Sequence, residues 1–169
     1  MLPMISFVGP HNVGKTTVLV KVLSCLVDRG IKVGVIKHAA HGFDLENSYK
    51  DSERLFGAGA AATVVTSPGQ MAMYRRVEKE LTVWDIREEI ADDVELVIVE
   101  GFKREKLPKI EVLRQEISTT PLDLENRVAV VCDFDIEGLD VPVFSMDDVA
   151  GISDFITENY LKSSGKTKL

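Results

Sequence analysis

Short apolar runs alternate with helical patterns along most of the 169 residues. Mostly apolar runs that are bounded by glycine or polar residues predict strands, and they cover residues 4–8, 32–37, 62–66, 95–100, 109–113, 127–132 and 141–144. Apolar residues at helical spacing predict helices over residues 15–29, 50–58, 81–90 and from 149 onward. This alternation predicts an α/β fold with a mainly parallel sheet and helices on both faces.

Three local features refine these elements. The helix over residues 15–29 is apolar nearly all round, which predicts burial on more than one face. Ser145, three residues ahead of Asp148, predicts a capping box at the start of the last helix. A Ser-Pro-Gly turn at residues 67–69 predicts a β-hairpin extension around residues 62–75.

Length and composition favour a single domain over residues 1–161, followed by a polar, disordered tail over 162–169. The sequence has no apolar run of about 18 residues, so no membrane span is expected. It also begins without a basic leader, and we expect a cytoplasmic protein. Cys25 and Cys132 lie in apolar runs, which favours burial over a disulfide or a zinc site.

The charge balance is acidic, with 27 Asp and Glu against 20 Lys and Arg and a net charge of −7. This balance argues against a general nucleic-acid binder, because such proteins need a dominant basic face. Basic residues nevertheless recur at predicted strand ends, at Lys15, Lys37 and over residues 103–109. We therefore expect an acidic domain with one basic edge directed at phosphate.

The strongest motif lies between the first predicted strand and helix. Gly9-Pro10-His11-Asn12-Val13-Gly14-Lys15-Thr16 matches G-x-x-x-x-G-K-[ST] at every fixed position. Its glycines let backbone N–H groups turn inward around phosphate, and the helix N-terminus adds its dipole. Lys15 would reach the β- and γ-phosphates, Thr16 would supply a hydroxyl to Mg²⁺, and Thr17 could contact the α-phosphate. The residues expected to bind nucleotide are Gly9, His11, Asn12, Val13, Gly14, Lys15, Thr16 and Thr17.

A phosphate-binding loop of this kind needs a carboxylate for the Mg²⁺ shell. The apolar run over residues 96–99 delivers Glu100 to the carboxyl edge of the sheet, where ligands bind in open α/β folds. Asp51 is a further candidate in the segment after the second strand. The alternative for Glu100 is a solvated strand end. Glu100 and Asp51 are also the candidates for a catalytic role, which the sequence does not assign firmly.

Other polar residues could serve a second ligand or a partner. His38 and His41 follow the second predicted strand, and a basic cluster follows Glu100 at Lys103, Arg104 and Lys106. The plain alternative is a solvated loop in each case. His38, His41 and Asp44 could also form a metal site, which would suit a metal-insertion GTPase. A P-loop small-molecule or nucleotide kinase is another alternative, although the arginines suited to a lid are few.

Several further segments are specific to one family. They are Ile36-Lys37-His38, residues 50–54 (KDSER), Gly57-Ala58-Gly59-Ala60 and residues 99–103 (VEGFK). With the phosphate loop, their order and spacing over residues 4–106 resemble molybdopterin-guanine dinucleotide biosynthesis protein B (MobB), the GTP-binding adapter family of molybdenum-cofactor maturation. The predicted strand at 129–133 adds support.

The resemblance implies a P-loop NTPase-like fold, Mg²⁺ and GTP binding, slow GTPase activity and a homodimer. It implies a role beside the guanylyltransferase (MobA-type) that joins GMP to molybdopterin, for a molybdenum or tungsten cofactor; molybdopterin itself is a further candidate ligand. The chain departs from a typical GTPase, because it has no N-K-x-D guanine-reading motif. Asp133, after the strand at 127–132, is the candidate acceptor for the guanine N1 and N2 hydrogens.

Overall fold

The computed structural model describes residues 2–39 and 50–161. These residues form two compact units, a larger one within residues 1–38 and 83–169 and a smaller one within residues 39–82. The predicted tail over residues 162–169 lies outside the described part of the chain. No helix within the described residues is long and apolar enough to cross a membrane.

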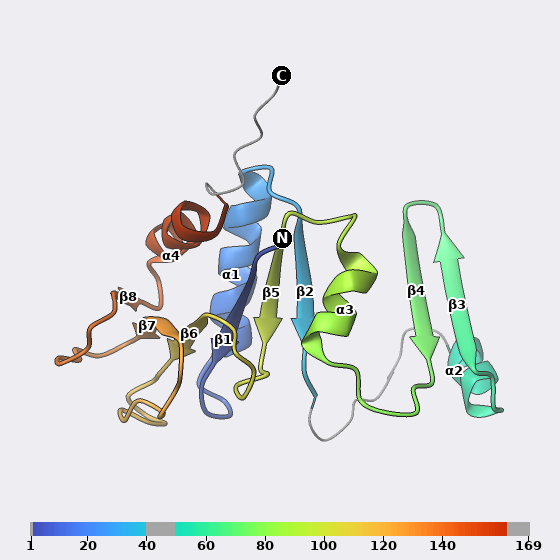
Figure 1. Ribbon diagram of the computed structural model, residues 1–169, viewed down its shortest axis with the longest axis horizontal. Coiled ribbons are helices and arrows are strands. Elements are labelled where there is room, and N and C mark those ends of the chain that lie inside the picture. The colour runs from blue at the N-terminus through green and yellow to red at the C-terminus, as the bar shows by residue number, and fades with distance from the viewer. Residues whose placement is uncertain (1, 40–49, 162–169) are drawn as a thin grey trace. The chain divides into compact units, whose positions relative to one another are not determined.

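The larger unit is built on a parallel sheet. Within the described residues it has six strands in the order β2-β5-β1-β6-β7-β8 (Figure 1). The strands are β1 (Met4–Val8), β2 (Val33–Lys37), β5 (Leu96–Glu100), β6 (Lys109–Val112), β7 (Arg127–Cys132) and β8 (Val143–Ser145). Because every pairing is parallel, the carboxyl ends share one edge. The loop after β1 therefore lies between the ends of β5 and β6.

Helices cover both faces of this sheet. The helices α1 (Lys15–Asp28) and α4 (Val149–Ile156) pack together on one face, and α3 (Val83–Ile90) lies on the other (Figure 1). Alternate residues of β1 show the division, since Ile5 and Phe7 join the α1–α4 core and Met4 joins the α3 core. This arrangement confirms the predicted fold class. A π-helical turn, η1 (Thr157–Leu161), continues α4.

The α1 helix buries a single stripe. Val18, Leu19, Val22 and Leu26 are buried, whereas Val20 on the outward side is 57% exposed. The helix contacts both the sheet and α4, so the prediction of burial on more than one side is confirmed in part. It does not hold all round, because Val20 faces solvent.

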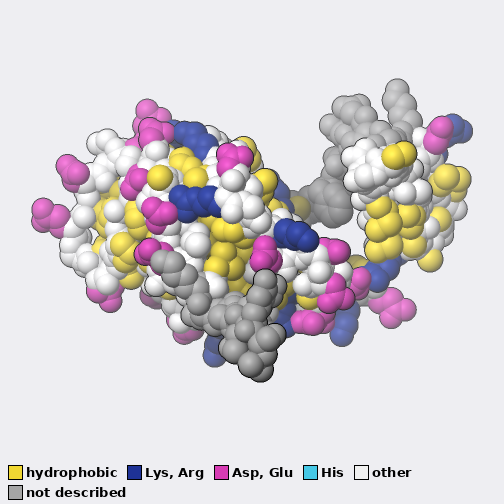
Figure 2. Space-filling model, turned by 90° about the horizontal axis from the view of Figure 1, so that it is seen from above, with side chains coloured by type: hydrophobic (Ala, Val, Ile, Leu, Met, Phe, Trp, Pro, Cys, Tyr) yellow, Lys and Arg dark blue, Asp and Glu magenta, His cyan; other side chains and the backbone are white. Residues whose placement is uncertain are grey.

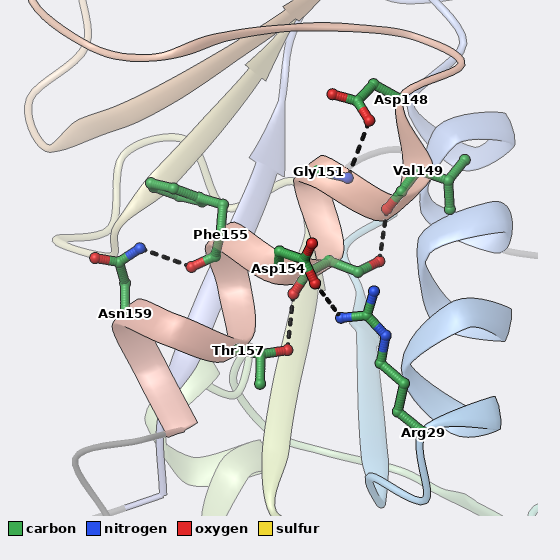
Figure 3. A network of polar contacts seen from close by, with 9 residues as sticks. Arg29, Asp148, Val149, Gly151, Asp154, Phe155, Thr157 and Asn159 are labelled. Atoms are coloured by element: carbon green, nitrogen blue, oxygen red, sulfur yellow. Dashed lines mark hydrogen bonds and ion pairs between the residues drawn. The ribbon is translucent and has the colours of Figure 1, made fainter.

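The start of α4 also differs from the prediction. The carboxylate of Asp148 accepts a hydrogen bond from the Gly151 N–H at 3.0 Å (Figure 3). The predicted capping box at Ser145 is wrong, because Asp148 immediately precedes the helix and is itself the cap. Farther along α4, Asp154 binds Arg29 at the end of α1 at 2.8 Å (Figure 3). This ion pair joins the two helices that cover one face of the sheet.

The smaller unit combines a helix with a hairpin. Its elements are α2 (Lys50–Gly57), β3 (Ala62–Ser67) and β4 (Gln70–Arg75), and β3 pairs with β4 in antiparallel register. Phe56 of α2 lies 6.3 Å from the ring of Tyr74, and the Arg76 guanidinium lies 4.4 Å from the Phe56 ring centre. These contacts join α2 to the hairpin, and the hairpin itself matches the predicted extension around residues 62–75.

One face of the hairpin is apolar and exposed. Val64 pairs with Met73 and Thr66 pairs with Met71, and residues that pair directly across two strands share a face. Val64, Met71 and Met73 are 53%, 70% and 48% exposed. Apolar side chains are visible on the surface of the smaller unit in Figure 2. Exposed apolar faces of this kind mark interaction sites in soluble proteins.

Candidate functional site

The loop that joins β1 to α1 depends on glycine at both ends. Gly9 has φ of 150°, and a Cβ there would lie 2.3 Å from the Val112 carbonyl oxygen of β6. Gly14 has φ of 92° and immediately precedes α1, where no side chain caps the helix. The first N–H groups of a helix have no partner within the helix and bind anions readily. The loop therefore presents backbone donors at the carboxyl edge of the sheet.

The Lys15 side chain folds back over this loop. Its Nζ donates to the carbonyl oxygens of Pro10 at 2.7 Å and Gly9 at 3.2 Å. Burial lowers the pKa of the Lys15 ammonium below its ordinary value, while the Glu100 carboxylate opposes this shift and Lys37 adds to it. A phosphate at the loop would favour the charged form of this lysine.

The Glu100 carboxylate contacts the side chains of two other residues of the site, Thr16 and Lys37. The Thr16 hydroxyl lies 3.0 Å from both of its carboxylate oxygens, and the Lys37 ammonium lies 3.5 Å from one of them. The Glu100 side chain is only 13% exposed. Parallel pairing places Glu100 opposite Lys37 on β2 and Phe7 on β1. The structure thus brings the predicted Lys15, Thr16 and Glu100 together.

This donor set suits a magnesium ion. Mg²⁺ takes oxygen ligands and is usually held by one or two carboxylates together with substrate phosphates and water. Thr16 and Glu100 supply a hydroxyl and a carboxylate within 3.0 Å of each other, beside the loop that would hold the phosphates. Neighbouring Lys37 would add positive charge toward the phosphates.

The remaining loop residues have distinct surroundings. His11, Asn12 and Thr17 are exposed at the loop and the first turn of α1, whereas Val13 is fully buried in the core. Asn12 adopts φ of 60°, a left-handed conformation that asparagine tolerates better than most residues. Val13 therefore anchors the loop, and its side chain is not available to a ligand.

The basic segment after Glu100 divides between two edges of the sheet. Lys103 and Arg104 are exposed just beyond the end of β5. Lys106 lines a surface cavity with Leu2, Pro3 and Met4. Lys109 is 2% exposed, and its Nζ donates to the carbonyl oxygens of Glu105, Leu107 and Glu125.

The predicted basic edge is therefore wrong for Lys106 and Lys109. Because β5 and β6 run parallel, the chain must return to the amino end of the sheet before β6 begins. Lys106 consequently lies beside the start of β1, and Lys109 holds the connecting segment by its hydrogen bonds.

The other predicted residues are only partly placed. The backbone N–H of His38 donates a hydrogen bond to the Glu100 carbonyl oxygen at 3.0 Å. The centre of the His38 ring lies 4.5 Å from the centre of the Phe102 ring. His41 and Asp44 lie outside the described residues. Asp51 belongs to α2 of the smaller unit, where its exposed carboxylate lies 3.6 Å from Arg54. Its role at a metal stays a prediction.

The structure adds one residue that the sequence analysis missed. The Arg114 Nε lies 3.5 Å from a carboxylate oxygen of Asp133, and a Cβ on Gly14 would lie 3.9 Å from the Arg114 Nη1. The other Asp133 oxygen accepts the Gln115 N–H at 2.8 Å. Arg114 belongs to no motif. The signal that could have found it is a charged residue directly after a strand that ends beside the loop.

This fold and this site define a P-loop α/β protein. A glycine-bounded loop, its lysine and a threonine–carboxylate pair lie together at the carboxyl edge of a parallel sheet. The model of the family described as MobB, molybdopterin guanine dinucleotide synthesis protein B, matches residues 4–133. The chain belongs to this family, and the resemblance noted in its sequence is confirmed.

Known relatives are similar over nearly the whole chain. The molybdopterin-guanine dinucleotide biosynthesis adapter protein of Escherichia coli (strain K12) is 35% identical over 171 residues, which cover 98% of this chain and 97% of that protein. The crystal structure of a MobB homolog from Bacillus stearothermophilus has a TM-score of 0.72 at 29% identity and covers 92% of this chain and 95% of its own. Bacillus subtilis MobB has a TM-score of 0.76 at 27% identity, with 92% and 96% covered.

Proposed function

We propose that this chain is a Mg²⁺- and GTP-binding adapter of molybdenum (or tungsten) pterin cofactor biosynthesis. It would assist a MobA-type guanylyltransferase in attaching GMP to molybdopterin. The adapter role follows from the name of the E. coli relative, which is similar over nearly its whole length. The observation that carries the nucleotide part is the Thr16 hydroxyl 3.0 Å from both Glu100 oxygens, beside a glycine-bounded loop.

The proposed nucleotide contacts come mainly from the loop and α1. The backbone N–H groups of Gly9 and of residues 11–17, together with the Lys15 ammonium, would bind the phosphates. The oxygen donors of Thr16 and Glu100 would hold Mg²⁺, and Asp51 is a proposed further ligand. When bound, Mg²⁺ would neutralise phosphate charge. His38, Lys103 and Arg104 remain candidates for contact with a partner or with molybdopterin.

Hydrolysis of GTP is proposed to be slow. Fast P-loop GTPases use a glutamine that orients water or an arginine that stabilises the transition state. Gln115 follows β6, and its backbone N–H donates a hydrogen bond to the Asp133 carboxylate. Since β6 and β5 flank β1 on opposite sides, Gln115 lies across the loop from Glu100. Its position therefore does not suit the orientation of water at the metal side.

A preference for GTP over ATP is proposed to depend on Asp133. This residue follows β7, which is separated from β1 by β6. Its carboxylate is 35% exposed, and a carboxylate offers about four lone-pair sites. It can therefore hold the Gln115 N–H and still accept hydrogens from guanine N1 and N2.

We also propose a cytoplasmic homodimer joined through the hairpin of the smaller unit. Its support is the exposed apolar face formed by Val64, Met71 and Met73. Burial of such side chains against a second copy contributes roughly 25 cal/mol for each Å² removed from water.

The adapter role is tested by titrating a MobA-type guanylyltransferase with the full chain, with and without GTP and Mg²⁺. We expect binding that strengthens when GTP is present. The Lys15→Ala variant should lose this GTP effect. Lys21→Ala is the matched control, because Lys21 lies on the same helix and, within the described residues, forms an ion pair with the exposed Asp147. Equal lack of binding with and without GTP would refute the adapter role.

A further inference from the structure

Arg114 and Asp133 occupy the side of the phosphate loop that faces away from Glu100. The sheet order places β5 on one side of β1 and β6, then β7, on the other. Glu100 ends β5, whereas Arg114 and Asp133 follow β6 and β7. A nucleotide that spans the loop with its terminal phosphates and Mg²⁺ toward Glu100 would place its nucleoside end on the side of β6 and β7.

The Arg114 side chain is held in a defined position. Its Nε lies 3.5 Å from Asp133, whose second oxygen accepts the Gln115 N–H at 2.8 Å. The Arg114 carbonyl oxygen accepts the N–H groups of Ile117 and Ser118 at 2.9 and 2.8 Å. Leu113, the preceding residue, is fully buried. The backbone of Arg114 is therefore held by its hydrogen bonds, and the Asp133 carboxylate orients the guanidinium.

The guanidinium keeps the capacity to bind an anion. The side chain is 42% exposed, and a guanidinium has five N–H donors in a planar fork that suits phosphate. Its Nη1 is the atom that a Cβ on Gly14 would approach to 3.9 Å. Gly14 immediately precedes α1, whose N-terminus no side chain caps, so the guanidinium lies beside the start of this helix.

We propose that Arg114 binds the α-phosphate of the nucleotide, with Asp133 as the residue that positions it. This inference rests on the proposed nucleotide binding and adds a contact on the nucleoside side of the loop. It predicts a contact that does not depend on the γ-phosphate, because the terminal phosphates lie toward Glu100. The same carboxylate would then link base preference to phosphate binding.

The test is calorimetric titration of the full chain with GTP and with GDP, both in Mg²⁺. Arg114→Ala should lower the affinities for GTP and for GDP by the same factor. The expected factor is about tenfold or more, as for the loss of one charge-assisted hydrogen bond. Arg114→Lys should lose less affinity, because the positive charge remains. Arg29→Ala is the matched control, since Arg29 also pairs with one exposed aspartate, Asp154, but lies at the far end of α1.

Two results would overturn this inference alone. Unchanged affinities in Arg114→Ala would remove Arg114 from the site, and weakening of GTP but not GDP would move its contact to the γ-phosphate. Thermal unfolding of each variant separates a folding defect from a binding defect, and Arg114→Lys covers the case in which the alanine variant does not fold. Failure of the unaltered chain to bind either nucleotide would refute the proposed function as well.

Discussion

Glu100 links the main groups of the site at the residue scale. Its carboxylate contacts Thr16 and Lys37, and its charge opposes the burial that lowers the pKa of Lys15. The buried run before it, which is fully inaccessible from Leu96 to Val99, fixes its position at the edge of the sheet. One carboxylate thereby organises a hydroxyl and two cations.

Glu100→Gln should separate metal binding from phosphate binding. The amide keeps the shape of the side chain but removes the charge that would hold Mg²⁺. GTP affinity in Mg²⁺ should fall by about tenfold, as for loss of one charge-assisted contact, while affinity in EDTA should stay the same or rise. Titration calorimetry measures both values. Glu95→Gln, before the start of β5, is the control; an equal loss in both variants would contradict a metal role for Glu100.

Gly9→Ala should destabilise the fold. The new Cβ would lie 2.3 Å from the Val112 carbonyl oxygen at a φ of 150°, and strained backbone of this kind costs about 1–3 kcal/mol before the clash is counted. Gly57→Ala is the control, because its Cβ meets nothing within 4 Å. Urea unfolding compares the two variants. A Gly9→Ala protein as stable as the unaltered chain would show that the loop can move away from β6.

Sequence predicts those site residues whose chemistry a local motif encodes. The G-x-x-x-x-G-K-[ST] motif predicts Lys15 and Thr16 directly, and the apolar run before Glu100 predicts that this residue lies at the edge of the sheet. Arg114 escaped prediction because its approach to Gly14 depends on β6 lying beside β1, a neighbour relation between segments about one hundred residues apart. Lys106 was misplaced for the same reason, since the edge that it reaches depends on the direction of β6.

At the scale of elements, the cap of α4 offers a sharp comparison between neighbouring aspartates. Asp148→Ala removes the acceptor of the Gly151 N–H and should cost about 0.5–2 kcal/mol of unfolding free energy. Asp147→Ala removes only an exposed ion pair with Lys21, and such pairs contribute little. Chemical denaturation measures both. A larger loss for Asp147→Ala would contradict the assignment of Asp148 as the cap.

Strand and helix cores were predictable, whereas ends were less so. The strands β1 and β7 coincide with their predictions because their apolar runs end sharply, at proline and glycine around β1 and at polar residues around β7. The edge strand β8 was predicted at 141–144 and lies at Val143–Ser145. It pairs only with β7 in the described sheet, so fewer contacts fix its ends. The Ser145 capping box failed because Asp148, which immediately precedes the helix, supplies the acceptor.

At the scale of the whole molecule, net charge and local charge have different consequences. The sequence has a surplus of acidic residues, and acidic side chains are scattered over the face of the larger unit that Figure 2 shows. Lys15, Lys37 and Arg114 instead gather at the carboxyl ends of β1, β2 and β6. The sequence predicted this acidic background and part of the basic edge. The sequence could not show that Lys106 and Lys109 lie toward the amino end of the sheet.

The proposed homodimer predicts a dependence on the hairpin. Replacing Met71 and Met73 together by aspartate places charges on the exposed apolar face and should convert dimer to monomer in sedimentation velocity. Val20→Asp is the control, because Val20 is also exposed but belongs to α1 of the larger unit. A double variant that remains dimeric would place the interface elsewhere.

The most direct measurement for the proposed function is the affinity of the full chain for Mg²⁺–GTP, compared with Mg²⁺–ATP and with the Lys15→Ala variant. We expect GTP to bind more tightly than ATP, and the variant to lose binding of both while it keeps its far-ultraviolet circular dichroism spectrum. Retained affinity in folded Lys15→Ala would contradict phosphate binding at the loop. Equal affinity for ATP and GTP would contradict the guanine preference.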